Sequence, residues 1–255
     1  MTEIKACLFD FNGTMFFDGR LHDKAWRETI SKETGKTITD EDIRKYIYGC
    51  NNRDIVKHFF LDKYGWDKLD SAQAEDENNK TKSNKTDEEI DNIIFQQIDK
   101  EITTLAKEIA EKKESLYRTL CRELDTIELA PGLADFLDEL ETKDIKCAIV
   151  SAATKENIEL YFEVFNLAKW FSWEQIVYDN GTLPGKPAPD MWLAAADRLH
   201  VDIGNCVVYE DSLNGILAAK RAGAARIVAV YGDADRNMLE KQGLADEYVH
   251  DWTKE

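Results

Sequence analysis

Three segments of the sequence carry side chains suited to a phosphoryl group and a divalent cation. Glu210 and Asp211 follow an apolar run, and adjacent carboxylates at a strand end are costly unless a cation such as Mg²⁺ neutralises them. Lys186 precedes two prolines that open a helix, where its ammonium could pair with a carboxylate or a phosphoryl oxygen. Ser151 ends another apolar run, and its hydroxyl could hydrogen-bond a phosphoryl oxygen beside the free N–H groups of the following helix.

A fourth segment places an acid, Asp10, at the end of a short apolar strand. Residues 6–14 read Ala-Cys-Leu-Phe-Asp-Phe-Asn-Gly-Thr, so the chain would turn at Asn12 and Gly13 directly after the strand. The carboxyl ends of parallel strands are where α/β folds bind ligands. The segment therefore predicts that Asp10 faces a ligand site.

Each segment also has an ordinary structural explanation. Asp10 could cap its turn, Ser151 could cap a helix, Lys186 could be solvated in a loop, and one of the two later acids could cap the helix that follows. The four segments nevertheless occur in a fixed order, three of them directly follow apolar strands, and all would converge on one edge of the sheet. The combination therefore favours a functional site.

The elements that would position these residues alternate between strands and helices. Strands are predicted by apolar runs at 4–9, 145–150, 175–178, 206–209 and 226–230. Helical periodicity lies between the later runs, at 133–140, 156–165, 190–199 and 213–221. This alternation predicts an α/β fold with a mostly parallel sheet.

Residues 18–127 interrupt this rhythm and predict an inserted α-helical domain. Helices are expected at 21–34, 40–47, 52–64 and 87–124, with Asp40 as an N-cap and with Gly35 and Gly65 as stops. The charged, nearly apolar-free stretch 72–87 predicts a solvated loop. The α/β core would thus comprise residues 1–17 and 128–255.

Composition excludes several classes of partner. The 255 residues carry 50 acids and 33 bases, and a net charge of −17 would repel nucleic acid and anionic membranes. The sequence has neither an apolar stretch long enough to span a membrane nor a secretory signal, so a cytoplasmic location is expected. The five cysteines are scattered and predict reduced thiols, with Cys7, Cys147 and Cys206 buried in strands.

Taken together, the four segments resemble the motifs of the haloacid dehalogenase-like (HAD) phosphotransferases. The wording of Gly-Lys-Pro-Ala-Pro-Asp at 185–190 and of Glu-Asp-Ser at 210–212 is similar to the β-phosphoglucomutase-like branch. This resemblance covers the whole chain. It implies a Rossmann-like core with an α-helical cap inserted after the first motif.

The resemblance implies a role for each matching residue. Asp10 would be the nucleophile that forms an aspartyl-phosphate. Mg²⁺ would be held by the Asp10 carboxylate, the backbone carbonyl of Asn12, and Asp211, with Glu210 bound directly or through water.

Further matches imply contacts with the substrate. Ser151, or alternatively Thr14, and Lys186 would hold the transferred phosphoryl oxygens. Gly13 and Ala152 would complete the substrate-binding loops.

Asn12 departs from the family pattern, which has a second Asp at this position. An amide cannot exchange a proton near neutral pH, and general acid–base help contributes about 10²–10⁴-fold. Three explanations remain open, namely a natural variant, an engineered Asp→Asn change, and a non-catalytic phospholigand-binding relative. Deamidation at Asn12-Gly13 could also restore a carboxylate.

The inserted domain offers three further candidates. His22 and Arg53 match in position a histidine and a phosphate-gripping arginine of the mutase branch, so substrate contacts are expected, against the alternative of exposed polar residues. Lys113 is expected to be solvated on its charged helix. Lys155 lies one place later than the mutase lysine, about 100° further around a helix, which argues against a strict mutase.

The sequence thus predicts a Mg²⁺-dependent HAD-like phosphatase acting on a small phosphorylated metabolite, with a sugar phosphate as one option. The alternatives are a hexose-phosphate mutase of the β-phosphoglucomutase type and a phospholigand-binding protein without turnover. A monomer is expected.

Overall fold

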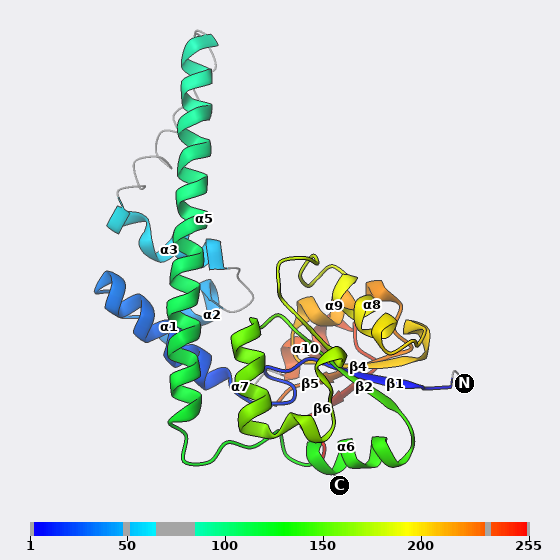
Figure 1. Cartoon of the computed structure of the whole chain (residues 1–255). Helices are drawn as coiled ribbons and strands as arrows, with labels where there is room; N and C mark the ends of the chain where they lie inside the picture. The colour runs from blue at the N-terminus through cyan, green and yellow to red at the C-terminus, as the bar shows by residue number, and fades with distance from the viewer. Residues whose placement is uncertain (1–2, 48–51, 65–84, 233–235, 254–255) are drawn as a thin grey trace. The chain divides into compact units, whose positions relative to one another are not determined.

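The computed structural model describes residues 3–47, 52–64, 85–232 and 236–253. The chain divides into two compact units, which we call the core unit and the helical unit. The core unit comprises Met1–Arg20 and Cys121–Glu255, and the helical unit comprises Leu21–Leu120. The helical unit is therefore an insertion between the first strand and the rest of the core unit, as Figure 1 shows by colour.

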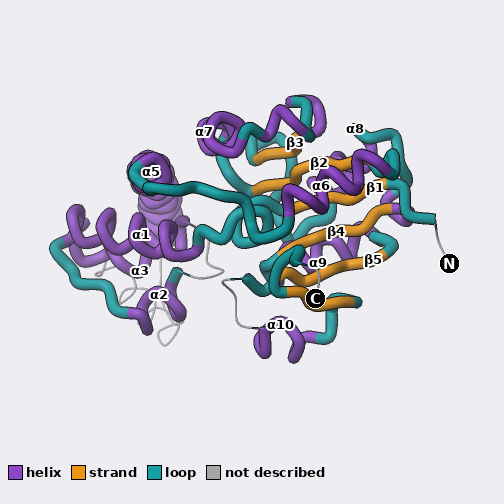
Figure 2. Tube along the Cα trace, turned by 90° about the horizontal axis from the view of Figure 1, so that it is seen from below, coloured by secondary structure: helices purple, strands orange, loops and turns teal. Residues whose placement is uncertain are grey.

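A six-stranded parallel sheet forms the centre of the core unit. The strands are β1 (Ala6–Phe9), β2 (Lys146–Ser151), β3 (Ile176–Tyr178), β4 (Cys206–Glu210), β5 (Arg226–Val230) and β6 (Glu247–Val249). Their order is β3-β2-β1-β4-β5-β6 (Figure 2), which places the first strand in the middle. The predicted parallel α/β fold is confirmed, whereas β6 was not predicted because its three residues are too short for a periodic signal.

Helices cover both faces of this sheet, which explains why the central strands are apolar throughout. Helices α8 (Asp190–Arg198) and α9 (Leu213–Ala222) lie on one face, and α6 (Leu133–Thr142) lies on the other (Figure 1). All four residues of β1 are buried. On the α6 face, the ring of Phe9 stacks on Tyr209 at 4.8 Å and meets Phe136 edge-on.

The remaining elements of the core unit are helices α7 (Lys155–Phe165) and α10 (Arg236–Gln242) and three short 3₁₀ turns. These turns span Leu167–Lys169, Trp173–Gln175 and Ile203–Asn205. Helix α10, like β6, falls outside the predicted elements.

The helical unit is built from α1 (Gly19–Thr34), α2 (Asp40–Tyr46), α3 (Asn52–Tyr64) and α5 (Lys85–Arg122). Helices α1 and α5 extend into the core unit by two residues at one end each. Apolar side chains of all four helices form its core, including Ile30, Ile43, Phe60 and Ile109.

The helix boundaries of the helical unit agree only in part with the predicted ones. Thr39, not Asp40, is the N-cap of α2, because its hydroxyl accepts from the Asp42 N–H and Asp42 returns the bond in a capping box. Gly35 ends α1 with a φ of +75°, as expected. Residues 85 and 86, predicted as loop, belong to α5, while Gly65 and positions 72–84 lie outside the described residues.

The cysteines in the described ranges are free thiols, as predicted. Cys7, Cys121, Cys147 and Cys206 are buried, and burial raises the pKa of the Cys7 thiol to about 12. Cys50 lies outside the described residues. Separately, none of the helices within the described ranges has both the length and the apolar character needed to cross a membrane.

Candidate active site

Three neighbouring strands bring the predicted residues to one edge of the sheet. Phe9 pairs in register with Ile149 of β2 and with Tyr209 of β4. Asp10, directly after β1, and Glu210, the last residue of β4, therefore lie side by side, and the Asp10 N–H donates to the Tyr209 carbonyl at 2.9 Å. The pairing of these buried strands thus fixes the positions of both carboxylates relative to one another.

Lys186 is the cation of this site. Its side chain is only 8% exposed, and its Nζ donates to Asp10 Oδ1, to Glu210 Oε2 at 2.6 Å and to the Val150 carbonyl at 3.4 Å. The ammonium also lies over the buried Trp192 ring, 4.8 Å from its centroid. Although burial would lower the pKa of Lys186, the Asp10 and Glu210 carboxylates outweigh it and raise the pKa, so the lysine is charged.

Two glycines make room for the acids. A Cβ on Gly13 would lie 2.1 Å from Asp211 Oδ2, and Gly13 has a φ of +75°. A Cβ on Gly215 would lie 1.9 Å from Glu210 Oε2. The other oxygen of Glu210 accepts from the Ser212 N–H at 2.9 Å and the Ser212 hydroxyl at 2.7 Å, so Ser212 fixes this carboxylate.

The acidic groups fit a hard divalent cation. Asp10, Glu210 and Asp211 each offer an oxygen, and the three atoms lie within 4.8 Å of one another. Burial, followed by repulsion from Glu210, raises the pKa of Asp10 to about 8. Burial and the neighbouring Glu210 and Asp10 also raise the pKa of Asp211. A cation would relieve this repulsion, so the donor set is consistent with Mg²⁺.

This cluster makes the stability of the metal-free protein dependent on pH. The folded chain keeps a proton on Asp10 up to about pH 8, whereas the unfolded chain releases it near the ordinary value of 3.8. Because the unfolded state then binds fewer protons, the free energy of unfolding is expected to fall as pH rises through this interval. Mg²⁺ competes with protons for the same oxygens, so it should raise the melting temperature more at about pH 8 than at about pH 5.5. Thermal unfolding with and without Mg²⁺ measures this, and an equal shift at both pH values would contradict it.

Asn12 lies at the centre of a hydrogen-bond network rather than in solvent. Its Nδ2 donates to Asp18 Oδ2 at 2.6 Å and to the Tyr161 hydroxyl at 2.7 Å. Its Oδ1 accepts from the Ser151 hydroxyl at 3.4 Å. The amide is thus oriented by residues of three separate chain segments.

Asp18 and Tyr161 were not among the residues predicted from the sequence. Asp18 is 1% exposed and its other oxygen accepts from the Gly13 N–H at 3.1 Å. Tyr161 is fully buried and stacks on Phe11 at 4.1 Å. Asp18 gave a weak signal as a lone acid after two phenylalanines, but Tyr161 was assigned only to the apolar face of its helix because nothing in its helical spacing indicates a polar partner.

Ser151, Ala152 and Thr14 lie on the loops that follow β1 and β2. The buried Ser151 hydroxyl accepts from the Ala153 N–H at 3.1 Å, while Ala152 is exposed. Thr14 is fully buried, and its Oγ1 meets no hydrogen-bond partner within the described part of the chain. A buried hydroxyl in this state is available to a ligand.

A family model for haloacid dehalogenase-like hydrolase matches residues 4–223. The chain belongs to the haloacid dehalogenase-like hydrolases. This membership confirms the resemblance seen in the motifs, and the chain is an enzyme of the hydrolase class.

Three known proteins match between 76% and 98% of the chain. A phosphorylated carbohydrates phosphatase from Thermotoga maritima is 25% identical over 227 residues, which cover 89% of this chain and 85% of that protein. Beta-phosphoglucomutase from Bacillus subtilis is 28% identical over 200 residues, covering 76% and 87%. A solved HAD hydrolase, family IA, variant 3, from Entamoeba histolytica gives a TM-score of 0.76 at 27% identity, covering 98% and 94%.

In the helical unit of this HAD-like hydrolase, Lys113 is buried, so the prediction of a solvated lysine is wrong. It is 4% exposed, and its Nζ lies 2.6 Å from His22 Nδ1 and 2.8 Å from Glu114 Oε1. The ammonium also contacts the rings of Trp26 and Tyr117, and Tyr117 stacks on His22 at 4.1 Å. Charge alone suggested solvent, whereas an aromatic enclosure buries the long stem.

This contact joins His22 to a buried cation, with the Lys113 ammonium as the donor to His22 Nδ1. His22 is half-buried on α1, and its role toward substrate stays a prediction. Arg53 lies in α3, but its side chain is outside the described residues, so its role also stays a prediction.

Two other features of the HAD-like chain are separate from the predicted residues. Lys155 is exposed and pairs with Glu159 at 3.1 Å within α7.

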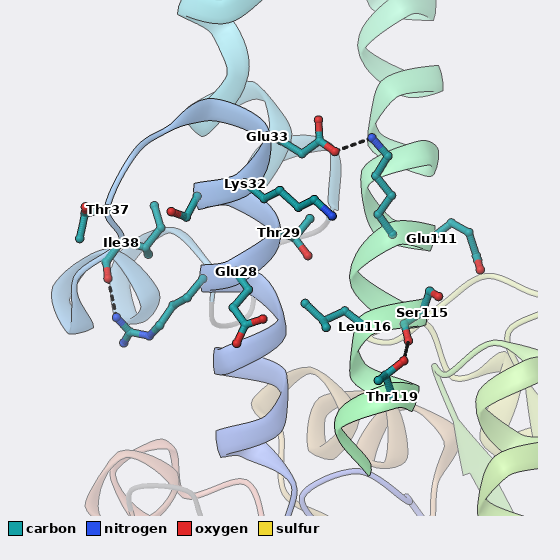
Figure 3. A pocket seen from close by; sticks show the side chains of 13 residues that line it. Glu28, Thr29, Lys32, Glu33, Thr37, Ile38, Glu111, Ser115, Leu116 and Thr119 are labelled. Atoms are coloured by element: carbon teal, nitrogen blue, oxygen red, sulfur yellow. Dashed lines mark hydrogen bonds and ion pairs between the residues drawn. The ribbon is translucent and has the colours of Figure 1, made fainter. Parts of the chain in front are cut away.

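A groove of about 1300 Å³ runs between α1 and α5 of the helical unit (Figure 3). Its lining carries both charge signs, with Lys112 bound to Glu33, and it includes none of the predicted site residues.

Proposed function

We propose that this chain is a Mg²⁺-dependent phosphoric monoester hydrolase that acts on a small phosphorylated metabolite. The observation that carries the proposal is the buried contact of Asp10 with Lys186 beside Glu210 and Asp211. The similar protein from Thermotoga maritima is named a phosphorylated carbohydrates phosphatase, and the one from Bacillus subtilis is named a beta-phosphoglucomutase. Both names support a sugar phosphate as one substrate of this chain. We expect a monomer in the cytoplasm.

Asp10 would act as the nucleophile. Its carboxylate oxygen attacks phosphorus, the bond to the leaving oxygen breaks, and an aspartyl-phosphate forms that water then hydrolyses. Because phosphoryl transfer spreads negative charge over the equatorial oxygens, positioning and cations supply most of the catalysis. The Lys186 ammonium contacts Asp10 and would also bind the transferred group, and the Ser151 and Thr14 hydroxyls would complete the oxygen contacts.

Mg²⁺ would be held by Asp10, Glu210 and Asp211, together with the backbone carbonyl of Asn12. When bound, it would neutralise the phosphoryl charge and align the phosphorus with Asp10. The glycines at 13 and 215 support this assignment, since any side chain there would displace the acids.

A phosphate-release screen tests the proposal. The chain is incubated with a panel of phosphorylated metabolites in Mg²⁺, and release is expected for some members and is expected to stop when EDTA removes the metal. A glucose 1-phosphate to glucose 6-phosphate conversion without phosphate release would instead support the mutase. Phosphosugars that raise the melting temperature without any turnover would support a binding protein.

A further inference from the structure

The surroundings of residue 12 are built for an amide and not for an acid. Both N–H donors of Asn12 are used, one by the Asp18 carboxylate at 2.6 Å and one by the Tyr161 hydroxyl at 2.7 Å. A carboxylate in the same place would set two anionic oxygens in contact inside a buried pocket, which is strongly unfavourable. These contacts match the hydrogen-bonding groups of an amide at position 12.

Asp18 does not replace the missing acid. Each of its oxygens accepts from an N–H group, namely Asn12 Nδ2 and the Gly13 backbone, so a proton on Asp18 would cost one of these bonds. Asp18 is thus a positioning residue that holds Asn12 and the turn after Asp10 in place.

The other titratable groups beside Asp10 are also engaged. The Lys186 ammonium is bound by two carboxylates, and it would leave both buried if it gave up a proton. Tyr161 is fully buried, stacks on Phe11, and its hydroxyl accepts from the Asn12 amide. Among these residues, Lys186 and Asp18 are thus held in ionic or hydrogen-bonded contacts, and Glu210 and Asp211 would be occupied by the Mg²⁺ of the proposed function.

We propose that this site prefers phosphoryl donors whose leaving group departs as a stable anion, as acyl phosphates, phosphoanhydrides and aryl phosphates do, over phosphate esters of ordinary alcohols. The inference rests on the proposed function and narrows its substrate class. Among sugar phosphates, it favours those phosphorylated at the anomeric oxygen, which is more acidic than an ordinary hydroxyl.

The chemistry balances without a general acid. An Asp10 oxygen attacks phosphorus, the bond from phosphorus to the leaving oxygen breaks, and that oxygen keeps the electron pair and departs as an anion that solvent protonates later. Water then attacks the aspartyl-phosphate, its proton passes to solvent, and the bond to Asp10 breaks with the electron pair returning to the carboxylate. An alkoxide cannot leave in this way without a proton, which Asn12 cannot supply.

The experiment is a leaving-group series. Values of kcat/KM in Mg²⁺ are measured for acetyl phosphate, for aryl phosphates of graded phenol acidity, and for glycerol phosphate as the ordinary alkyl ester. We expect a steep decline toward the alkyl ester, by about 10²–10⁴-fold relative to p-nitrophenyl phosphate, which is the contribution of the absent acid. Rapid quenching and mass spectrometry should also find Asp10 phosphorylated, because water attack lacks a base.

A double variant that exchanges the amide and the carboxylate of positions 12 and 18 provides the second part of the experiment. The double variant N12D/D18N moves the carboxylate to position 12 and the amide to position 18, so it retains one amide–carboxylate pair. It is expected to flatten the leaving-group dependence by raising alkyl ester hydrolysis, whereas N12D alone should be less stable because two carboxylates meet. The wild-type series decides the question even if the double variant does not fold.

The outcomes separate this inference from the proposed function. Equal rates for alkyl and aryl esters in the wild type would overturn the inference and show that another group, such as His22, gives the proton, while the phosphatase assignment would stand. A failure to release phosphate even from acetyl and aryl phosphates would overturn the proposed function itself.

Discussion

Asp10→Asn is expected to reduce phosphate release by at least about 10⁴-fold, the effect of removing a catalytic nucleophile. The amide keeps the size of the side chain and can still meet Lys186, so the loss would come from chemistry rather than from packing. The measurement is phosphate release in Mg²⁺ with the best substrate of the screen. Retention of more than about a hundredth of the wild-type rate would contradict the assignment of Asp10 as nucleophile.

The same substitution is expected to stabilise the metal-free protein. Burial and Glu210 raise the pKa of Asp10 to about 8, so the folded state at neutral pH keeps a proton that the unfolded state releases. An Asn side chain removes that cost, which we expect to raise the free energy of unfolding by about 1–3 kcal/mol and the melting temperature by about 2–8 °C. The gain should grow toward about pH 8 and shrink toward about pH 5.

Asp197→Asn provides the control for the combined loss of phosphate release and gain of stability expected of Asp10→Asn. Asp197 is an exposed acid on α8, so its neutralisation is expected to leave phosphate release unchanged and the stability within about 0.5 kcal/mol. Activity loss together with lower stability in Asp10→Asn would instead indicate that Asp10 supports the fold.

Lys186→Met is expected to lower the free energy of unfolding by about 3–5 kcal/mol, since it leaves Asp10 and Glu210 buried without their cation. Phosphate release should fall by about 10²–10³-fold, because the transferred oxygens lose a charged donor. Chemical denaturation in the absence and presence of Mg²⁺ measures the effect. Part of the lost stability should return with Mg²⁺, which can neutralise the same carboxylates.

Lys155→Met is the matched control, because Lys155 also pairs with an acid but its side chain is 54% exposed. Its removal should change stability by no more than about 0.5 kcal/mol, as exposed ion pairs contribute little. Equal effects of the two substitutions would contradict a special contribution from the buried contacts of Lys186.

The fold was largely predictable because its signals are local. Each apolar run before Asp10, Ser151 and Glu210 consists of a few consecutive residues, and burial on both faces of a parallel sheet imposes this pattern. Strand β6 gave no such signal, since its three residues are exposed or half-buried at the sheet edge. The sequence also did not distinguish Asp40 from Thr39 as the N-cap of α2. Either residue type can cap a helix, and the capping box between Thr39 and Asp42 decides between them.

Local patterns could not determine the charge state and contacts of single side chains. Lys113 stands among charged residues in the sequence, yet His22, Trp26 and Tyr117, distant in the chain or one helical turn away, enclose it. Whether a lysine is solvated depends on what packs over its stem, and that is a property of the assembled helices.

The sequence alone determined the parallel α/β core with its helical insertion and the set of Asp10, Ser151, Lys186, Glu210 and Asp211, because strand ends and turn residues are encoded locally. Only the tertiary structure decided the surroundings of Asn12. Asp18 and Tyr161 reach its amide from other segments, and hydrogen-bond complementarity exists only once those segments meet. The sequence therefore presented Asn12 as a missing acid, whereas the folded chain presents it as an amide with matched partners.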